Sequence, residues 1–129
     1  MHRIWIFLGA LAGLSGVTMA AAGAWIWQAL GPAASGLVQT ATQMQMSHAL
    51  ALLFCGLSAE RTGRGHWAAA SFALGILVFC GGLYLRAFEF PRLLGISPQG
   101  IIPIGGALLM LGWTLLAISA LRPRWPRRK

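Results

Sequence analysis

The sequence predicts an all-α fold: an integral membrane bundle of four transmembrane helices, in a single domain that covers residues 1–129. The first observation is composition, because 57% of the residues are hydrophobic, only 9% are charged and the mean hydropathy is +0.71. Soluble domains are about one quarter charged. The second observation is that the apolar residues form long runs, and a membrane-spanning helix needs roughly 20 such residues. The four runs are 4–30, 41–59, 67–87 and 101–121.

The first run, 4–30, ends at Gly31-Pro32, a pair typical of a turn. Small residues recur along it every few positions and predict a strip on which a second helix approaches closely. The third and fourth runs carry glycines at similar intervals. The predicted helix-packing residues are Gly9, Gly13, Gly16, Gly23, Gly75, Gly82, Gly105 and Gly112.

The second run, 41–59, holds the polar residues that most resemble a site. Thr40, Gln43 and Ser47 fall on one face of a helix, and His48 lies at the edge of that face. An ionisable side chain near the bilayer middle is expected to face protein or water. Two interpretations stay open: a proton-relay, solute or ligand site, or a neutral histidine bonded to a neighbouring helix. The candidate intramembrane polar site is Thr40, Gln43, Gln45, Ser47, His48 and Tyr84.

Arg86 and Glu89 lie at the end of the third run, 67–87, at the spacing of an ion pair. The fourth run, 101–121, places Pro103 in its first turn, where the missing N–H of proline is not needed. The sequence thus predicts four consecutive spans with short connections.

Basic residues predict the orientation. Four spans put both termini on one side together with Arg61 and Arg64, and that side carries most of the positive charge. By the positive-inside rule both termini are cytoplasmic, in a bacterial inner (plasma) membrane. The net charge of +8 follows from this topology, so no nucleic-acid partner is predicted. The expected partners are the lipid bilayer and, at the basic tail 122–129, anionic lipid head groups.

Enzymatic and cofactor chemistry find little support. The two carboxylates, Glu60 and Glu89, are predicted on opposite sides of the membrane, so they cannot act as a pair. Only Met44 and His48 share a helical face among the possible soft-metal ligands, which are Met44, Met46, His48, Cys55 and Cys80. The sequence therefore predicts no enzyme, no catalytic residue, no bound cofactor and no metal.

Three motifs resemble a known family. They are QTATQMQMSHALALL at 39–53, FCGGLYL at 79–85 and PIGGALLMLGW at 103–113. Together they resemble the YgdD-like and YwdK-like family of small, uncharacterised, four-span bacterial inner-membrane proteins. The matching positions are Thr40, Gln45, His48, Gly82, Leu83, Tyr84, Pro103, Gly105, Gly106, Gly112 and Trp113. Gly23-Ala24-Trp25 stands where the family usually has glycine-alanine-histidine. The resemblance implies the fold and a membrane location, and no established activity.

The leading hypothesis is a non-catalytic accessory or assembly component of a larger membrane complex, because packing surfaces are extensive and a catalytic set is lacking. A small oligomeric transporter or channel, with a polar route through Gln43, Ser47, His48 and Tyr84, is the alternative. A metal- or haem-binding protein that uses His48 and Met44 is a third hypothesis.

Overall fold

The computed structural model describes residues 2–23, 25–90 and 97–121. Every regular element in these ranges is helical, which confirms the predicted all-α fold. The elements are α1 (His2–Gly23), the short 3₁₀-helix η1 (Trp27–Leu30), α2 (Pro32–Thr62), α3 (His66–Gly75), η2 (Ile76–Cys80), α4 (Gly81–Ala87) and α5 (Pro98–Leu121). The segment 91–96 and the basic tail 122–129 lie outside the described residues.

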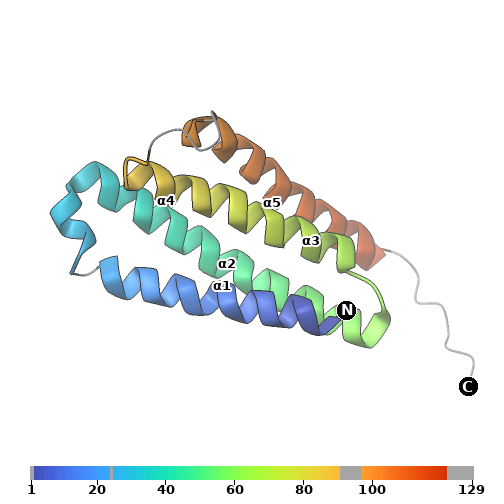
Figure 1. Cartoon of the computed structure of the whole chain (residues 1–129). Helices are drawn as coiled ribbons and strands as arrows, with labels where there is room; N and C mark the ends of the chain where they lie inside the picture. Colours follow the sequence, from blue (N-terminus) through green and yellow to red (C-terminus); the bar gives the residue numbers. More distant parts are fainter. Residues whose placement is uncertain (1, 24, 91–96, 122–129) are drawn as a thin grey trace, which may run out of the picture.

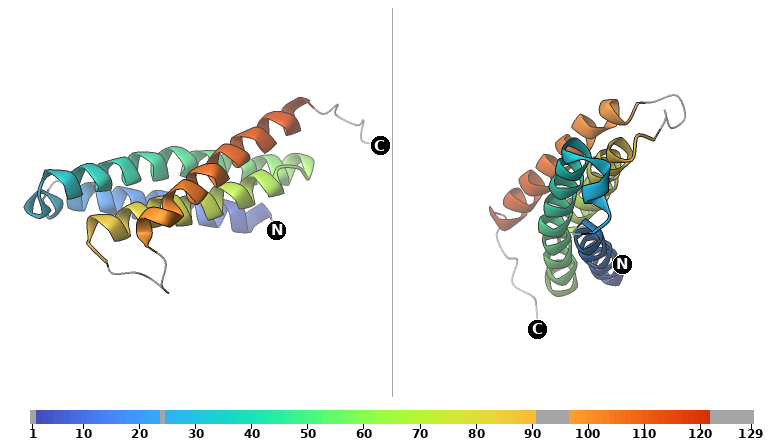
Figure 2. Two further views of the ribbon diagram at one scale, coloured as in Figure 1. Left: turned by 90° about the horizontal axis from the view of Figure 1, so that it is seen from above. Right: turned by 90° about the vertical axis from the view of Figure 1, so that its left-hand side faces the viewer.

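In the described residues the helices form four rods that run back and forth along the length of the bundle (Figure 1). α3, η2 and α4 form a single rod in which the five residues of η2 make a wider, π-helical turn. α2 packs against α1 and also against the α3–α4 rod, and α5 packs on that rod and crosses it at an angle (Figure 2). The two outermost rods, α1 and α5, are therefore the most exposed.

The two ends of the bundle can be named by the glycines in their turns. The Gly63 end holds the start of α1, the loop between α2 and α3, and the end of α5 (Figure 1). The Gly31 end holds the turn between α1 and α2, the end of α4 and the start of α5. The two ends of the described chain, His2 and Leu121, thus lie at the same end of the bundle.

The first helix is shorter than the predicted run of 4–30. α1 stops at Gly23, and the chain turns through Trp25 before the single turn of η1. Gly31 has a φ of 90°, which favours glycine, and Pro32 then starts α2 at the position where its missing N–H costs nothing. The sequence remains largely apolar beyond Gly23, but α1 ends at that residue.

The second helix is longer than the predicted run of 41–59, because α2 spans 31 residues and ends at the left-handed Gly63. Its added turns carry polar residues, and α2 is not among the helices long and apolar enough to cross a membrane by composition alone. In the described residues those helices are three: His2–Gly23, His66–Ala87 and Pro98–Leu121. The fourth span stays a prediction.

The last two rods lie close to their predicted bounds, at 66–87 and 98–121. α5 begins three residues before the predicted 101, at Pro98, so Pro103 lies in its second turn. Its side chain is exposed there.

Glycines set the closest helix contacts. A Cβ added at Gly9 or Gly16 of α1 would meet Leu53 or Met46 of α2 at 2.8 Å and 2.7 Å. Between the α3–α4 rod and α5, four glycines make equally close contacts: Gly75 with Leu109, Gly82 with Ile102, Gly105 with Phe79, and Gly112 with Phe72. Gly13 faces open space, and Gly23 is the last residue of α1. Gly56 of α2 was not among the predicted helix-packing residues, and a Cβ added there would meet Ile6 of α1 at 2.8 Å.

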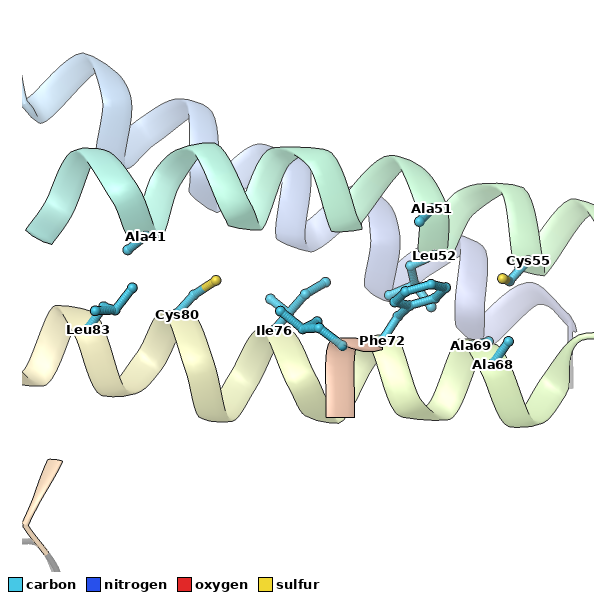
Figure 3. Close-up of a cluster of buried hydrophobic side chains, with 11 residues drawn as sticks. Ala41, Ala51, Leu52, Cys55, Ala68, Ala69, Phe72, Ile76, Cys80 and Leu83 are labelled. Carbon is cyan, nitrogen blue, oxygen red and sulfur yellow. The ribbon is translucent and has the colours of Figure 1, made fainter. Parts of the chain in front are cut away.

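The apolar core lies mainly between α2 and the α3–α4 rod (Figure 3). Its largest fully buried side chains are Phe72, Leu52, Cys55 and Cys80. This seam holds the three polar core residues Gln45, His48 and Thr42 on the α2 side. Packing thus decides which of the polar side chains of α2 turn inward.

Candidate functional site

Four polar side chains from three rods meet in the half of the bundle nearer the Gly31 end. We call Ser15, Thr42, Gln45 and Tyr84 the polar clamp. The amide of Gln45 donates to the backbone oxygen of Ala12 at 2.8 Å and to Ser15 Oγ at 2.7 Å. The Tyr84 hydroxyl donates to Gln45 Oε1 at 2.9 Å and lies 3.2 Å from Thr42 Oγ1. Gln45 therefore ties α1 and α4 to α2.

Each hydrogen-bond donor of the polar clamp already has an acceptor within the bundle. Both amide hydrogens of Gln45 have an acceptor, and the Tyr84 hydroxyl hydrogen points to Gln45. Ser15 Oγ is within reach of the carbonyl of Ala12, and Thr42 Oγ1 of the carbonyl of Val38. A hydroxyl carries only one hydrogen, so the groups left over are acceptor lone pairs. The clamp is a closed network that holds helices together.

His48 is the centre of a second group, the histidine cluster of His48, Phe72 and Trp113. His48 Nδ1 lies 2.7 Å from the carbonyl oxygen of Met44, and the indole N–H of Trp113 donates to His48 Nε2 at 3.2 Å. A carbonyl only accepts and an indole only donates, so the hydrogen is on Nδ1 and the ring is neutral. Phe72 packs against both rings, at centroid distances of 5.8 Å and 5.2 Å.

The other predicted site residues lie apart from these groups. Thr40, Gln43 and Ser47 are exposed and make no hydrogen bond to either group, and the hydroxyls of Thr40 and Ser47 donate to carbonyls of their own helix. Gln43 borders a surface cavity that Thr42 also lines. The structure therefore does not bring Gln43, Ser47, His48 and Tyr84 together along one path. Transport through such a route stays a prediction from the sequence.

Two further pairs join the rods at the Gly63 end. The indole N–H of Trp5 donates to His66 Nδ1 at 2.9 Å, and His2 Nε2 lies 3.8 Å from a carboxylate oxygen of Glu60. The predicted ion pair of Arg86 and Glu89 is not among the ion pairs of the described chain. Instead, the Glu89 N–H donates to the carbonyl of Arg86, and Glu89 adopts a φ of 52°. The backbone turns there instead of continuing the helix that the spacing assumed.

Possible metal ligands are also separated. Within the described residues no three His, Cys, Asp or Glu side chains are grouped to hold an ion. Met44 and His48 are joined through the Met44 backbone, and the two imidazole nitrogens already have partners. Cys55 and Cys80 are buried, free thiols on facing rods. A metal bound by His48 would have to displace Trp113 or Met44.

The predicted site lacked two of the four polar-clamp residues, Ser15 and Thr42, and two of the three histidine-cluster residues, Phe72 and Trp113. Thr42 lies three positions before Gln45, a spacing that places both on one helical face, so periodicity carried a usable signal for it. Ser15, Phe72 and Trp113 come from other rods. No spacing in the sequence links them to α2, because their proximity depends on how the rods pack.

We expect His48→Leu to destabilise the protein more than Arg86→Gln. His48 is buried, and its loss leaves the Trp113 N–H without its acceptor, while Arg86 is exposed. Interhelical hydrogen bonds in membranes contribute about 0.6 kcal/mol on average and up to about 1.7 kcal/mol. Thermal unfolding in mild detergent measures the difference. Trp113→Phe should lose a similar amount, and the double variant little more, whereas equal melting of His48→Leu and Arg86→Gln would contradict the expectation.

Comparison with known proteins gives a consistent set of relatives. Residues 19–106 match the model of a family described as a protein of unknown function, DUF423. A UPF0382 membrane protein of Staphylococcus epidermidis is 36% identical over 122 residues, which cover 93% of this chain and 97% of the relative. A UPF0382 membrane protein of Haemophilus influenzae is 34% identical over 122 residues, 92% of this chain and 86% of its own. The UPF0382 inner membrane protein YgdD of Escherichia coli is 29% identical over 123 residues, 93% and 91% of the two chains. No solved structure matches.

Proposed function

The chain belongs to the DUF423 family, whose relatives are membrane proteins of unknown function, and from this premise we propose that it is a non-catalytic accessory or assembly component of a larger membrane complex. Relatives named inner membrane proteins support a bacterial inner-membrane location. The remaining question is which surface of the bundle faces a partner.

The orientation that we propose has both termini in the cytoplasm. Arg3, Arg61 and Arg64 belong to the Gly63 end, and Arg86 lies toward the other end. The positive-inside rule then makes the Gly63 end cytoplasmic. Leu121 also belongs to that end, and we propose anionic lipid head groups as partners of the basic residues that follow it in the sequence.

The observation that carries the proposal is a polar surface that faces outward. We call Gly36, Thr40, Gln43 and Ser47 the outer face of α2, and all four are exposed. The hydroxyls of Thr40 and Ser47 bond to their own helix. The Gln43 amide has no hydrogen-bond partner among the described residues. Gln43 is thus the group on this face that a neighbouring helix would satisfy.

The depth of Gln43 makes this exposure costly. Ser47 is the middle residue of α2, and Gln43 precedes it by four residues. Four residues correspond to about 6 Å along the helix axis. A hydrocarbon layer of about 30 Å reaches roughly 15 Å to each side of the middle. A primary amide that lies in lipid without hydrogen bonds costs several kcal/mol. Contact with a polar group of a partner helix removes that cost, and the small Gly36 and Ser47 permit close approach.

The test compares complexes recovered from native membranes. We expect tagged protein in mild detergent to appear by native mass spectrometry with a stoichiometric heteromeric membrane partner. Gln43→Leu should remove most of that partner and leave the melting temperature of the isolated chain unchanged. Thr114→Val is the control, because Thr114 is also an exposed polar residue but lies on α5 and bonds its own helix, so its loss leaves the outer face of α2 intact.

Three results would contradict the accessory function. They are a monomer without any partner, a defined homo-oligomer alone, and a heteromeric complex that Gln43→Leu leaves intact. The homo-oligomer would instead favour the alternative of a small oligomeric transporter or channel. Metal analysis and an optical spectrum of the same sample test the third hypothesis, a site at His48 and Met44.

A further inference from the structure

Two neighbouring cavities open on the surface of the bundle, and they differ in polarity. The first, which we call the groove, has a volume of about 350 Å³ and runs between α1 and the α3–α4 rod, with α2 as its floor. Its α1 wall extends from Leu8 to Met19, which is about 16 Å at 1.5 Å per residue. Most of its lining is apolar, as at Leu11, Leu52 and Leu77.

The second, which we call the outer cavity, has a volume of about 410 Å³ and lies at the Gly31 end, where α1 ends and α2 begins. Its lining is rich in amides and hydroxyls, among them Gln28, Ser35 and Gln39. The amides of Gln28 and Gln39 have no hydrogen-bond partner among the described residues. They offer both donors and acceptors to a ligand.

The two cavities meet at Met19 and at the polar clamp. Met19 lines both of them. Thr42 lines the outer cavity, and the hydroxyl to which it is bonded belongs to Tyr84, which lines the groove. The apolar groove, about 16 Å long, thus adjoins the more polar outer cavity near the Gly31 end of the bundle. The groove suits the alkyl chain of a long amphiphile, and the outer cavity suits its polar head. The alkyl chain would then point from the Gly31 end toward the middle of the membrane.

Charge identifies the kind of head group. None of the described residues that line the groove or the outer cavity is charged. A phosphate or carboxylate enclosed there would lack a counter-charge, and such burial is unfavourable. Hydroxyl groups, which donate and accept, complement the free amides of Gln28 and Gln39. The polar clamp has no spare donor, so it does not hold a charged head inside the groove.

We propose that the chain binds a neutral amphiphile with a polyol head and one long alkyl chain. The head lies in the outer cavity against Gln28, Ser35 and Gln39, and the chain lies in the groove between α1 and the α3–α4 rod. Gln43 of the outer face of α2 also lines the outer cavity, but the residues assigned to the amphiphile are Gln28, Ser35, Gln39 and the walls of the groove, so the proposal does not depend on the accessory function proposed above.

Gly81 allows the groove to be filled without disturbing the fold. It lines the groove, and a Cβ added there meets no atom within 4 Å. Gly81→Leu should therefore extend into the space that the alkyl chain would occupy. Gly13→Leu is the matched control, because Gly13 also has nothing within 4 Å and does not line either cavity. Leu77→Trp narrows the same groove from an exposed position and serves if Gly81→Leu does not fold.

The experiment adds monooleoylglycerol to the purified, delipidated full chain and measures bound lipid by native mass spectrometry. We expect one bound molecule per chain, at least a tenfold weaker occupancy in Gly81→Leu, weaker occupancy in Gln39→Leu, and no change in Gly13→Leu. Lysophosphatidylglycerol with the same oleoyl chain should bind at least tenfold more weakly. The proposal is overturned if monooleoylglycerol does not bind, if Gly81→Leu and Leu77→Trp bind it like wild type, or if the anionic lipid binds equally well.

Discussion

Replacing Gly105 by alanine is expected to lower the stability of the protein more than any other single added methyl group. An ideal Cβ at Gly105 overlaps the backbone nitrogen of Phe79 and lies 2.6 Å from its Cα. These are backbone atoms within the π-helical turn of η2, so no side chain can rotate to make room. α5 must move away from the α3–α4 rod, and overpacking of this kind costs about 1–3 kcal/mol.

The next residue supplies the control for this substitution. A Cβ at Gly106 lies 3.6 Å from the ring of Phe79, which is an ordinary contact distance. Gly106→Ala should therefore melt within a degree or two of wild type in mild detergent, while Gly105→Ala melts clearly lower. If the two variants have the same melting temperature, the close approach of α5 to Phe79 described here is wrong.

This pair of glycines shows the limit of what spacing predicts about packing. The sequence indicates that glycine-rich strips mark helix contacts, and it placed Gly105 and Gly112 on one of them. It could not distinguish Gly13, which faces open space, from Gly9 and Gly16, which lie against α2. The direction in which a strip faces is set by the neighbouring rod, and the position of that rod is not local information.

Polar residues show the same limit. Periodicity correctly groups residues by face, but in a membrane helix it does not say which face is inside. Thr40 and Ser47 can satisfy their hydroxyls on their own helix and so can remain exposed. Gln45, with its longer amide side chain, does not bond its own helix and instead donates to Ala12 and Ser15 on α1. The polar clamp therefore exists only once α1 and α4 are in place.

Helix ends were predicted less well than helix positions, for a related reason. Hydropathy reports how many residues suit a hydrocarbon layer, whereas a helix ends where the backbone can turn. α1 ends at Gly23 within an apolar run, and α2 continues through polar residues at both of its ends until Gly63. Predicted bounds agreed best at 67–87, where the helical rod begins one residue earlier, at His66, and ends at the same residue, Ala87.

Gln45→Leu is the substitution that tests the polar clamp, and we expect it to destabilise the protein at least as much as Gly105→Ala. The variant removes two donated hydrogen bonds to α1 and one accepted from Tyr84 on α4. At about 0.6 kcal/mol for an average interhelical bond and up to about 1.7 kcal/mol for a strong one, the three bonds together contribute about 2–5 kcal/mol. Because both bonds to α1 are lost, that helix should loosen first. Hydrogen–deuterium exchange of α1 and thermal unfolding measure the two effects.

Gln43→Leu is the internal control for this prediction, since it makes the same chemical change two residues away on the same helix. Gln43 is exposed and its amide has no partner in the described part of the chain, so removing that amide breaks no bond within the bundle. The isolated Gln43→Leu chain should have the melting temperature and the hydrogen–deuterium exchange of wild type. The Gln43 amide is proposed to stabilise contact with a partner, whereas the Gln45 amide stabilises the folded chain itself. If Gln43→Leu destabilises the monomer as much as Gln45→Leu, the assignment of an inner and an outer face to α2 fails, and with it the surface on which the accessory function is proposed.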